Sequence, residues 1–139
     1  DPNCITKKID EVFTAINSNH DDKCEGLISI ITYKGKNILY GTDLLYLDDD
    51  AWDIIKKFKF DVVFFDQTYG EGFNAGGHLD AGMIAEYVKY MKENNIIDDK
   101  SLIYGIHFSH EGNGLHNDME ELAVRNGYHI AYDGMKLEI

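Results

Sequence analysis

The run Phe60-Asp61-Val62-Val63-Phe64-Phe65-Asp66 decides the fold, because it is apolar without alternation and ends on a carboxylate. A strand of this kind is typical of a sheet that is covered on both faces. A second such run, residues 102–107, follows a long helical pattern at residues 79–94. Strands that alternate with helices in this way predict an α/β fold with parallel strands at its centre.

The flanking segments extend this pattern in both directions. Residues 27–33 and 37–41 are two runs of residues that favour strands, and Lys34-Gly35-Lys36 between them has the chemistry of a hairpin turn. The other predicted elements are an amphipathic helix over 4–17, helices over 48–57 and 115–125, and a closing hairpin of 128–132 with 135–139 around Asp133-Gly134. We therefore divide the chain into an N-terminal helix and polar loop, 1–25, and a main domain, 26–139.

Composition sets the class of protein. The chain has 139 residues, 44% of them hydrophobic, which is the size of one ordinary domain. A net charge of -12 repels phosphate backbones and anionic membranes, so general nucleic-acid binding is not expected. No apolar run reaches the roughly 20 residues of a membrane span, and the N-terminal residues do not resemble a signal peptide. These features predict a soluble, cytoplasmic protein.

The two cysteines, Cys4 and Cys24, are too few and too far apart for a zinc knuckle or a disulfide framework. We expect both to be reduced thiols.

Polar residues that could carry chemistry stand where the predicted strands end. Asp43, Asp66 and His107 each close an apolar run. In α/β folds ligands gather outside the carboxyl ends of the strands, so two carboxylates and an imidazole there indicate a metal site or an acid/base site. His78 follows a glycine-rich loop and precedes the helix at 79–94. It could overhang the same edge, or it could merely cap the helix or be exposed.

Alternatives stay open for the remaining candidates. His107 and His110 lie three residues apart on a strand that is leaving its sheet, so we expect only one of them, His107, to bind a ligand directly. His110 would then support a ligand or contact a substrate, unless both are ordinary loop histidines. Asp43 is either a turn residue or a carboxylate that bridges two cations. We interpret the other histidines as surface residues: His20, His116 and His129.

Five short motifs, taken in order, suggest a family. They are 39–43 (Leu-Tyr-Gly-Thr-Asp), 61–66, 77–79 (Gly-His-Leu), 106–110 (Ile-His-Phe-Ser-His) and 131–139. Together they resemble the C-terminal half of a metallo-β-lactamase-fold hydrolase, within the phosphodiesterase branch that includes ribonuclease Z and the cyclic phosphodiesterase of phosphonate breakdown. The resemblance covers residues 26–139. It implies half of an αββα sandwich, a mixed sheet with flanking helices.

The resemblance also extends to the start of the chain. Asp1-Pro2 is similar to a family motif in which a histidine ligand comes just before such a dipeptide. The N-terminal helix would then be an insertion.

The resemblance further implies roles for individual residues. Asp43 would bridge two divalent metal ions and His107 would be a terminal ligand of the second. His78 would protonate the leaving group or steady the scissile phosphate. Asp66 would orient a ligand, and His110 would support a ligand or contact the substrate. Zinc is the expected metal, with manganese or iron as alternatives, and the substrate would be a small phosphoester.

The sequence departs from the family at one important place. The His-x-His-x-Asp-His motif, which supplies most ligands of both metals, is absent. One carboxylate and one imidazole are too few for two metals, because a catalytic zinc usually has three protein ligands. We therefore predict that the chain is part of a hydrolase about twice as long. Alone it would bind metal weakly and be inactive, and it would pair with a missing N-terminal half or with a second copy. The alternative is a non-catalytic interaction or oligomerisation half-domain of the same fold.

Overall fold

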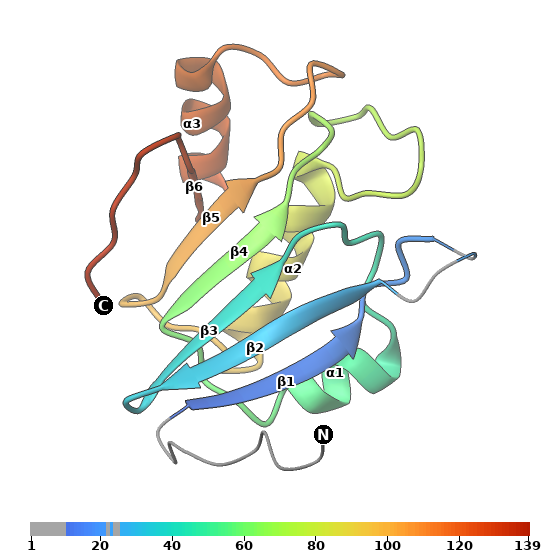
Figure 1. The fold of residues 1–139 in the computed structure, drawn as a ribbon. Helices are drawn as coiled ribbons and strands as arrows, with labels where there is room; N and C mark the ends of the chain where they lie inside the picture. Colours follow the sequence, from blue (N-terminus) through green and yellow to red (C-terminus); the bar gives the residue numbers. More distant parts are fainter. Residues whose placement is uncertain (1–10, 22, 24–25) are drawn as a thin grey trace.

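The protein forms a single mixed β-sheet with helices (Figure 1). The computed structural model describes residues 11–21, 23 and 26–139. The strands lie in the order β1-β2-β3-β4-β5-β6. Their bounds are β1 Glu11–Asn17, β2 Leu27–Tyr33, β3 Lys36–Gly41, β4 Val62–Asp66, β5 Leu102–Ile106 and β6 His129–Ile130, and the helices are α1 Asp49–Ile55, α2 Ala81–Glu93 and α3 His116–Arg125.

The strand directions place the carboxyl ends of five strands on one edge of the sheet. β2 runs antiparallel to both β1 and β3, so β1 and β3 point the same way. β4, β5 and β6 then continue parallel to β3. The carboxyl ends of β1, β3, β4, β5 and β6 therefore open onto the same edge, where an α/β sheet usually binds its ligand.

The main core lies between the sheet and the helices α1 and α2, which Figure 1 shows behind the strands. Leu39 of β3 and Phe65 of β4 face this side, and Ile55 of α1 and Ile84 of α2 pack against them, all fully buried. On β4, Val62 is also buried but Phe64 is only partly so. The expectation that this strand is covered on both faces therefore holds only in part.

The predicted local signals are confirmed at the central elements. The hairpin between β2 and β3 turns through Lys34 and Gly35, both with positive φ (48° and 77°), as a tight two-residue turn requires. The side chain of Asp48 caps α1 by accepting from the amide of Ala51 at 2.8 Å. None of the described helices is long and apolar enough to cross a membrane.

Two predicted elements are wrong within the described residues. Residues 11–17 form strand β1 instead of the end of a helix, whereas 4–10 lie outside the described residues. Their β-branched and aromatic side chains pair with β2 over the whole length of the strand, and this tertiary pairing outweighs the helical spacing. The closing hairpin does not form either: Asp133-Gly134 makes a turn, but β6 is a two-residue edge strand and no strand follows it.

Candidate functional site

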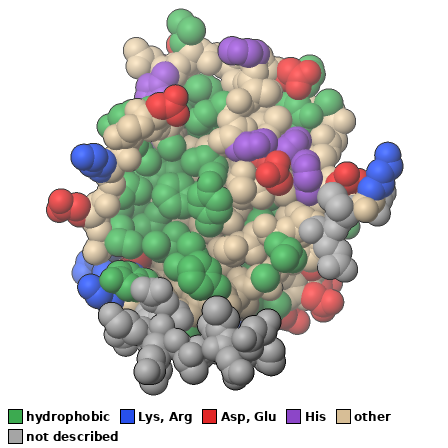
Figure 2. Space-filling view, viewed as in Figure 1, with side chains coloured by type: hydrophobic (Ala, Val, Ile, Leu, Met, Phe, Trp, Pro, Cys, Tyr) green, Lys and Arg blue, Asp and Glu red, His purple; other side chains and the backbone are tan. Residues whose placement is uncertain are grey.

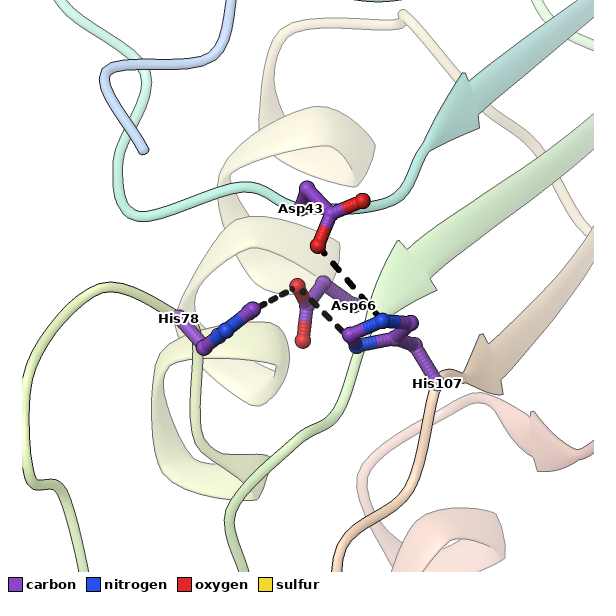
Figure 3. A group of neighbouring side chains, drawn as sticks. All are labelled: Asp43, Asp66, His78 and His107. Atoms are coloured by element: carbon purple, nitrogen blue, oxygen red, sulfur yellow. Dashed lines mark hydrogen bonds and ion pairs between the residues drawn. The ribbon is translucent and has the colours of Figure 1, made fainter. Parts of the chain in front are cut away.

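Four side chains from separate segments meet at the carboxyl edge of the sheet (Figure 3). They are Asp43 after β3, Asp66 at the end of β4, His78 before α2 and His107 after β5. Each offers one nitrogen or oxygen atom, and these atoms all lie within 4.8 Å of one another. The structure thus brings together four of the five candidate residues.

Asp66 forms the buried base of the site. Its side chain is fully buried, and its carboxylate accepts four hydrogen bonds. One oxygen accepts from the amide and hydroxyl of Thr68 at 2.8 and 2.7 Å. The other accepts from the amide of Leu44 at 3.1 Å and pairs with Nδ1 of His78 at 2.7 Å. A buried carboxylate is tolerated when its oxygens are satisfied in this way, and it then serves to orient its neighbours.

His78 is held with one ring nitrogen free. Because Asp66 accepts the Nδ1 proton, the lone pair is left on Nε2. The backbone that follows His78 is fixed by Tyr69, whose amide donates to the carbonyl of Leu79 and whose carbonyl accepts from the amide of Ala81. The cap of α2 is Asp80, not His78, so the helix-capping alternative for this histidine is wrong.

His107 is oriented by a threonine. Its Nδ1 lies 2.9 Å from the hydroxyl oxygen of Thr68, which in turn donates its one proton to Asp66. Nδ1 therefore carries the ring proton that Thr68 accepts, and Nε2 is left free. That Nε2 atom lies 3.5 Å from Oδ1 of Asp43.

His20 is the residue that the sequence analysis missed. Its Nδ1 lies 2.6 Å from the carbonyl oxygen of Gly77, so it donates there, and its Nε2 lies 3.8 Å from Oδ1 of Asp43. Its ring also packs against that of His78, with centroids 4.5 Å apart. The interpretation of His20 as a surface residue is wrong, because its side chain is only 28% exposed and contacts the site.

A usable signal for His20 was present in the sequence. Once residues 11–17 are recognised as a strand, His20 follows that strand just as Asp43 follows β3. The incorrect helix prediction hid this relation.

The other histidines lie apart from the four-residue group. His110 is exposed in the loop after β5, so a role in contacting a substrate stays a prediction. His129 pairs with Glu120 of α3 at 2.6 Å, and the ring of His116 contacts Tyr132.

Two loops beside the site are tied tightly together. The amide of Gly70 donates to the carbonyl of Glu111 at 3.1 Å, and a Cβ atom on Gly70 would lie only 1.8 Å from the carbonyl oxygen of Gly112. The side-chain amide of Asn113 donates to the carbonyls of Thr68 and Ser109 at 2.9 and 3.0 Å. The loops that follow β4 and β5 are thereby held as one unit next to His107.

The donor set suits a divalent transition metal. Asp43 Oδ1 is approached by two imidazole Nε2 atoms, from His20 and His107, and both rings donate their Nδ1 protons elsewhere. Metal-binding histidines usually have this arrangement, because a hydrogen bond at one nitrogen fixes the lone pair on the other. Zinc, manganese and iron all accept imidazole and carboxylate ligands, so the residues fit such an ion.

Comparisons with known proteins agree on the fold. No family model matches the sequence, and no curated protein matches it. The metallo-beta-lactamase fold protein YhfI from Bacillus subtilis superposes with a TM-score of 0.68 at 15% identity, covering 97% of this chain and 52% of that one. A possible metal-dependent hydrolase from Veillonella parvula superposes with a TM-score of 0.66 at 11% identity, covering 94% of this chain and 55% of that one.

This structural similarity confirms the predicted metallo-β-lactamase-like α/β fold. The chain spans about half the length of both solved structures. The ribonuclease Z-like branch stays a prediction.

Proposed function

We propose that this chain carries one side of the active site of a dinuclear metal-dependent hydrolase that acts on phosphodiesters. One observation carries the proposal: the free Nε2 atoms of His20 and His107 approach the same oxygen of Asp43, at 3.8 and 3.5 Å. A carboxylate placed between two imidazoles is suited to bridge two metal ions, each of which takes one of the histidines.

The metal ions are proposed to be zinc, with manganese or iron as the alternatives that the same ligands allow. When bound, a pair of ions at such a site activates water and stabilises the charge on a phosphoryl group during in-line displacement. Asp43, His20 and His107 would hold the ions.

His78 is proposed as the acid that protonates the leaving oxygen. Its Nε2 atom is free, its side chain is 19% exposed, and its Nδ1 is bonded to the buried carboxylate of Asp66. Once Nε2 takes up a proton from solvent, the ring is charged, and the carboxylate of Asp66 stabilises that charge. The ring can then pass the proton from Nε2 to the leaving oxygen. Asp66 thus acts through His78, in keeping with its expected role in orientation.

The chain does not supply enough ligands for two ions among its described residues. Two imidazoles and a shared carboxylate leave each ion with two protein ligands, whereas catalytic zinc usually has three. We therefore propose that the remaining ligands come from a further segment of a longer polypeptide, and that this chain alone binds metal weakly and is inactive.

Zinc titration of this chain tests the metal site. We expect weak binding that Asp43→Asn abolishes, whereas Asp53→Asn, on the exposed surface of α1, should leave it unchanged. If wild type and Asp43→Asn bind zinc equally, Asp43 is not a ligand. Absence of binding in all three proteins would favour the alternative of a non-catalytic interaction half-domain.

The acid role needs a separate test in the polypeptide that carries the whole site. There, His78→Ala should strongly reduce turnover of a phosphodiester with an alkoxide leaving group, which must be protonated as it departs, while metal content is retained. The matched variant His129→Ala removes a histidine that pairs with Glu120 outside the site and should leave turnover unchanged. Unchanged turnover in His78→Ala would show that this histidine is not the acid.

A further inference from the structure

Among the described residues, three rings contact that of His78, and two of them belong to residues that would hold metal. The ring centroids of His20 and His107 lie 4.5 and 5.2 Å from that of His78. The third ring is Tyr69, which meets His78 edge-on at 6.1 Å. An alcohol that is protonated by His78 departs from the metal ions, so the neighbour it can meet is Tyr69 and what lies beyond it.

Beyond Tyr69 lies an exposed phenyl ring, that of Phe73. The centroids of these two rings are 5.6 Å apart. Tyr69 is only 6% exposed and its hydroxyl donates to the carbonyl of Gly76, whereas Phe73 is 42% exposed. Phe73 is therefore the ring on this side of His78 that a departing alcohol can touch.

The position of Phe73 is fixed by its loop. Its amide donates to the carbonyl of Gly70 at 3.3 Å, and a Cβ atom on Gly112 would lie only 2.8 Å from the Cβ atom of Phe73. The next residue, Asn74, donates from its side-chain amide to the carbonyl of His78 at 3.3 Å. The exposed ring thus keeps a set place relative to His78, and a contact group that is ordered in advance costs less to order when a ligand binds.

The surroundings of this ring carry negative charge and no positive charge. None of the connections β3–α1, β4–α2 and β5–α3 contains a lysine or an arginine. Glu71 lies two residues before Phe73, and the carbonyl of Glu111 accepts from the amide of Gly70 on the same turn. In Figure 2 the lysine and arginine side chains lie at the margins of this face, apart from the histidines. A positive charge would be attracted here and a further negative charge repelled.

An exposed phenyl ring in acidic surroundings is suited to an ammonium group. A cation over such a ring is attracted by the quadrupole of the ring, and quaternary ammonium ligands are recognised in this way. A neutral apolar group would also cover Phe73, but it would gain nothing from the carboxylates of Glu71 and Glu111. A nucleotide or another polyanion would be repelled by them. The observations therefore favour a cation over both.

We propose that Phe73 receives an ammonium group on the leaving alcohol, so that the substrate is a phosphodiester of an alcohol that carries a positive charge. The inference rests on the proposed function for the reaction and for the acid role of His78. Recognition of the cation itself requires neither metal nor hydrolysis, so it can be measured separately.

Recognition is tested by NMR titration of this chain in EDTA with choline and with its neutral isostere, 3,3-dimethylbutan-1-ol. Choline should cause saturable shifts in the signals of Phe73 and Gly112, and the isostere at the same concentrations should not. In Phe73→Leu, which keeps an apolar side chain, choline should no longer shift the signal of Gly112. Tyr33→Leu is the matched control and should retain the effect, because Tyr33 is 41% exposed and lies at the β2–β3 hairpin, at the opposite edge of the sheet.

Turnover is tested in the polypeptide that carries the whole site. The substrates are two methyl phosphodiesters, one of choline and one of 3,3-dimethylbutan-1-ol, and release of the larger alcohol is followed. Phe73→Leu should lower kcat/KM for the choline diester by about threefold to thirtyfold, and for the neutral diester by less than about twofold. Each substrate is compared with itself, so the different reactivities of the two alcohols cancel.

Two outcomes would overturn the proposal. If choline and the isostere bind this chain equally, or if neither binds, Phe73 does not select a cation. If Phe73→Leu changes kcat/KM for both diesters by the same factor, the ring is at most an apolar contact. A different result, in which choline binds as expected but neither diester is hydrolysed, would leave recognition of the cation standing and contradict the proposed function.

Discussion

Replacing Asp66 with asparagine should destabilise the protein far more than the same replacement at the other end of the same strand. Asp66 closes β4 and Asp61 precedes it. The carboxylate of Asp66 is fully buried and accepts only from protein donors, whereas the side chain of Asp61 is 33% exposed and accepts from the amide of Asn37 and from Lys36. Asp66→Asn and Asp61→Asn therefore make the same chemical change in two different environments.

The magnitude follows from the hydrogen bonds. In either orientation, the new NH₂ group of Asp66→Asn faces a backbone N–H, that of Thr68 at 2.8 Å or that of Leu44 at 3.1 Å. One buried donor is then unpaired, which costs about 1–3 kcal/mol, and the remaining bonds lose their charge-assisted strength, so we expect a total of about 2–4 kcal/mol. At Asp61, water can replace the lost partners, and the expected cost is below about 1 kcal/mol.

The assay is urea unfolding in EDTA, so that no bound metal contributes. Trp52 is the single tryptophan and packs against Tyr87 and Tyr90, so its fluorescence reports on the core. The free energy of unfolding should fall by the stated amounts with unchanged m-values. Equal losses in the two variants, or a loss below about 1 kcal/mol for Asp66→Asn, would refute the view that Asp66 is the buried base that orders the site.

Three further perturbations test other parts of the structure. Gly70→Ala should lower the free energy of unfolding in urea by more than about 3 kcal/mol or prevent folding, because its Cβ would lie 1.8 Å from the carbonyl oxygen of Gly112 and a backbone atom cannot easily move away. A near-neutral result would contradict the close contact between the loops that follow β4 and β5. His20→Ala should weaken zinc binding in a titration, whereas His129→Ala should not; equal affinities would remove His20 from the site. At Glu120, burial raises the pKa of the carboxyl group, but hydrogen bonds from His129 and from the backbone amide of Ile130 outweigh it and lower the pKa below 4.5. This group therefore stabilises the fold above pH 4.5, and its contribution is lost as pH falls through the folded pKa. Glu120→Gln should therefore cost up to about 1 kcal/mol at pH 7 and nothing at pH values below the folded pKa, and a cost that does not change with pH would be the contrary result.

A residue of the candidate site could be predicted from sequence only where the strand before it could be recognised. Asp43, Asp66 and His107 each close a run that is apolar enough to identify as a strand from sequence, and parallel strands bring such ends to one edge. His20 follows β1, whose spacing also fits a helix, and only pairing with β2 along its whole length decides between the two.

The tautomers of the site could not be predicted from sequence. They depend on Thr68, which links Asp66 to His107 across neighbouring strands. That link exists because Asp66 and Ile106 are register partners, so Thr68 and His107 leave the sheet side by side. Register between strands is a tertiary property, and a single sequence does not state it.

Backbone strain marks the same edge of the sheet. Among the described residues, five that are not glycine have positive φ, and three of them adjoin the site: Asn19 before His20, Asp43 and His107. A side chain in this region costs of the order of 1–2 kcal/mol, so the conformation persists only where the surrounding contacts enforce it. At Asp43 and His107, where φ is 49° and 61°, the side chain reaches across the strand ends toward the facing imidazole or carboxylate (Figure 3). A chain that only needed to leave the sheet could use glycine at these positions without that cost. The strain is thus placed where it brings the ligand atoms together, which a half-domain used only for association would not require.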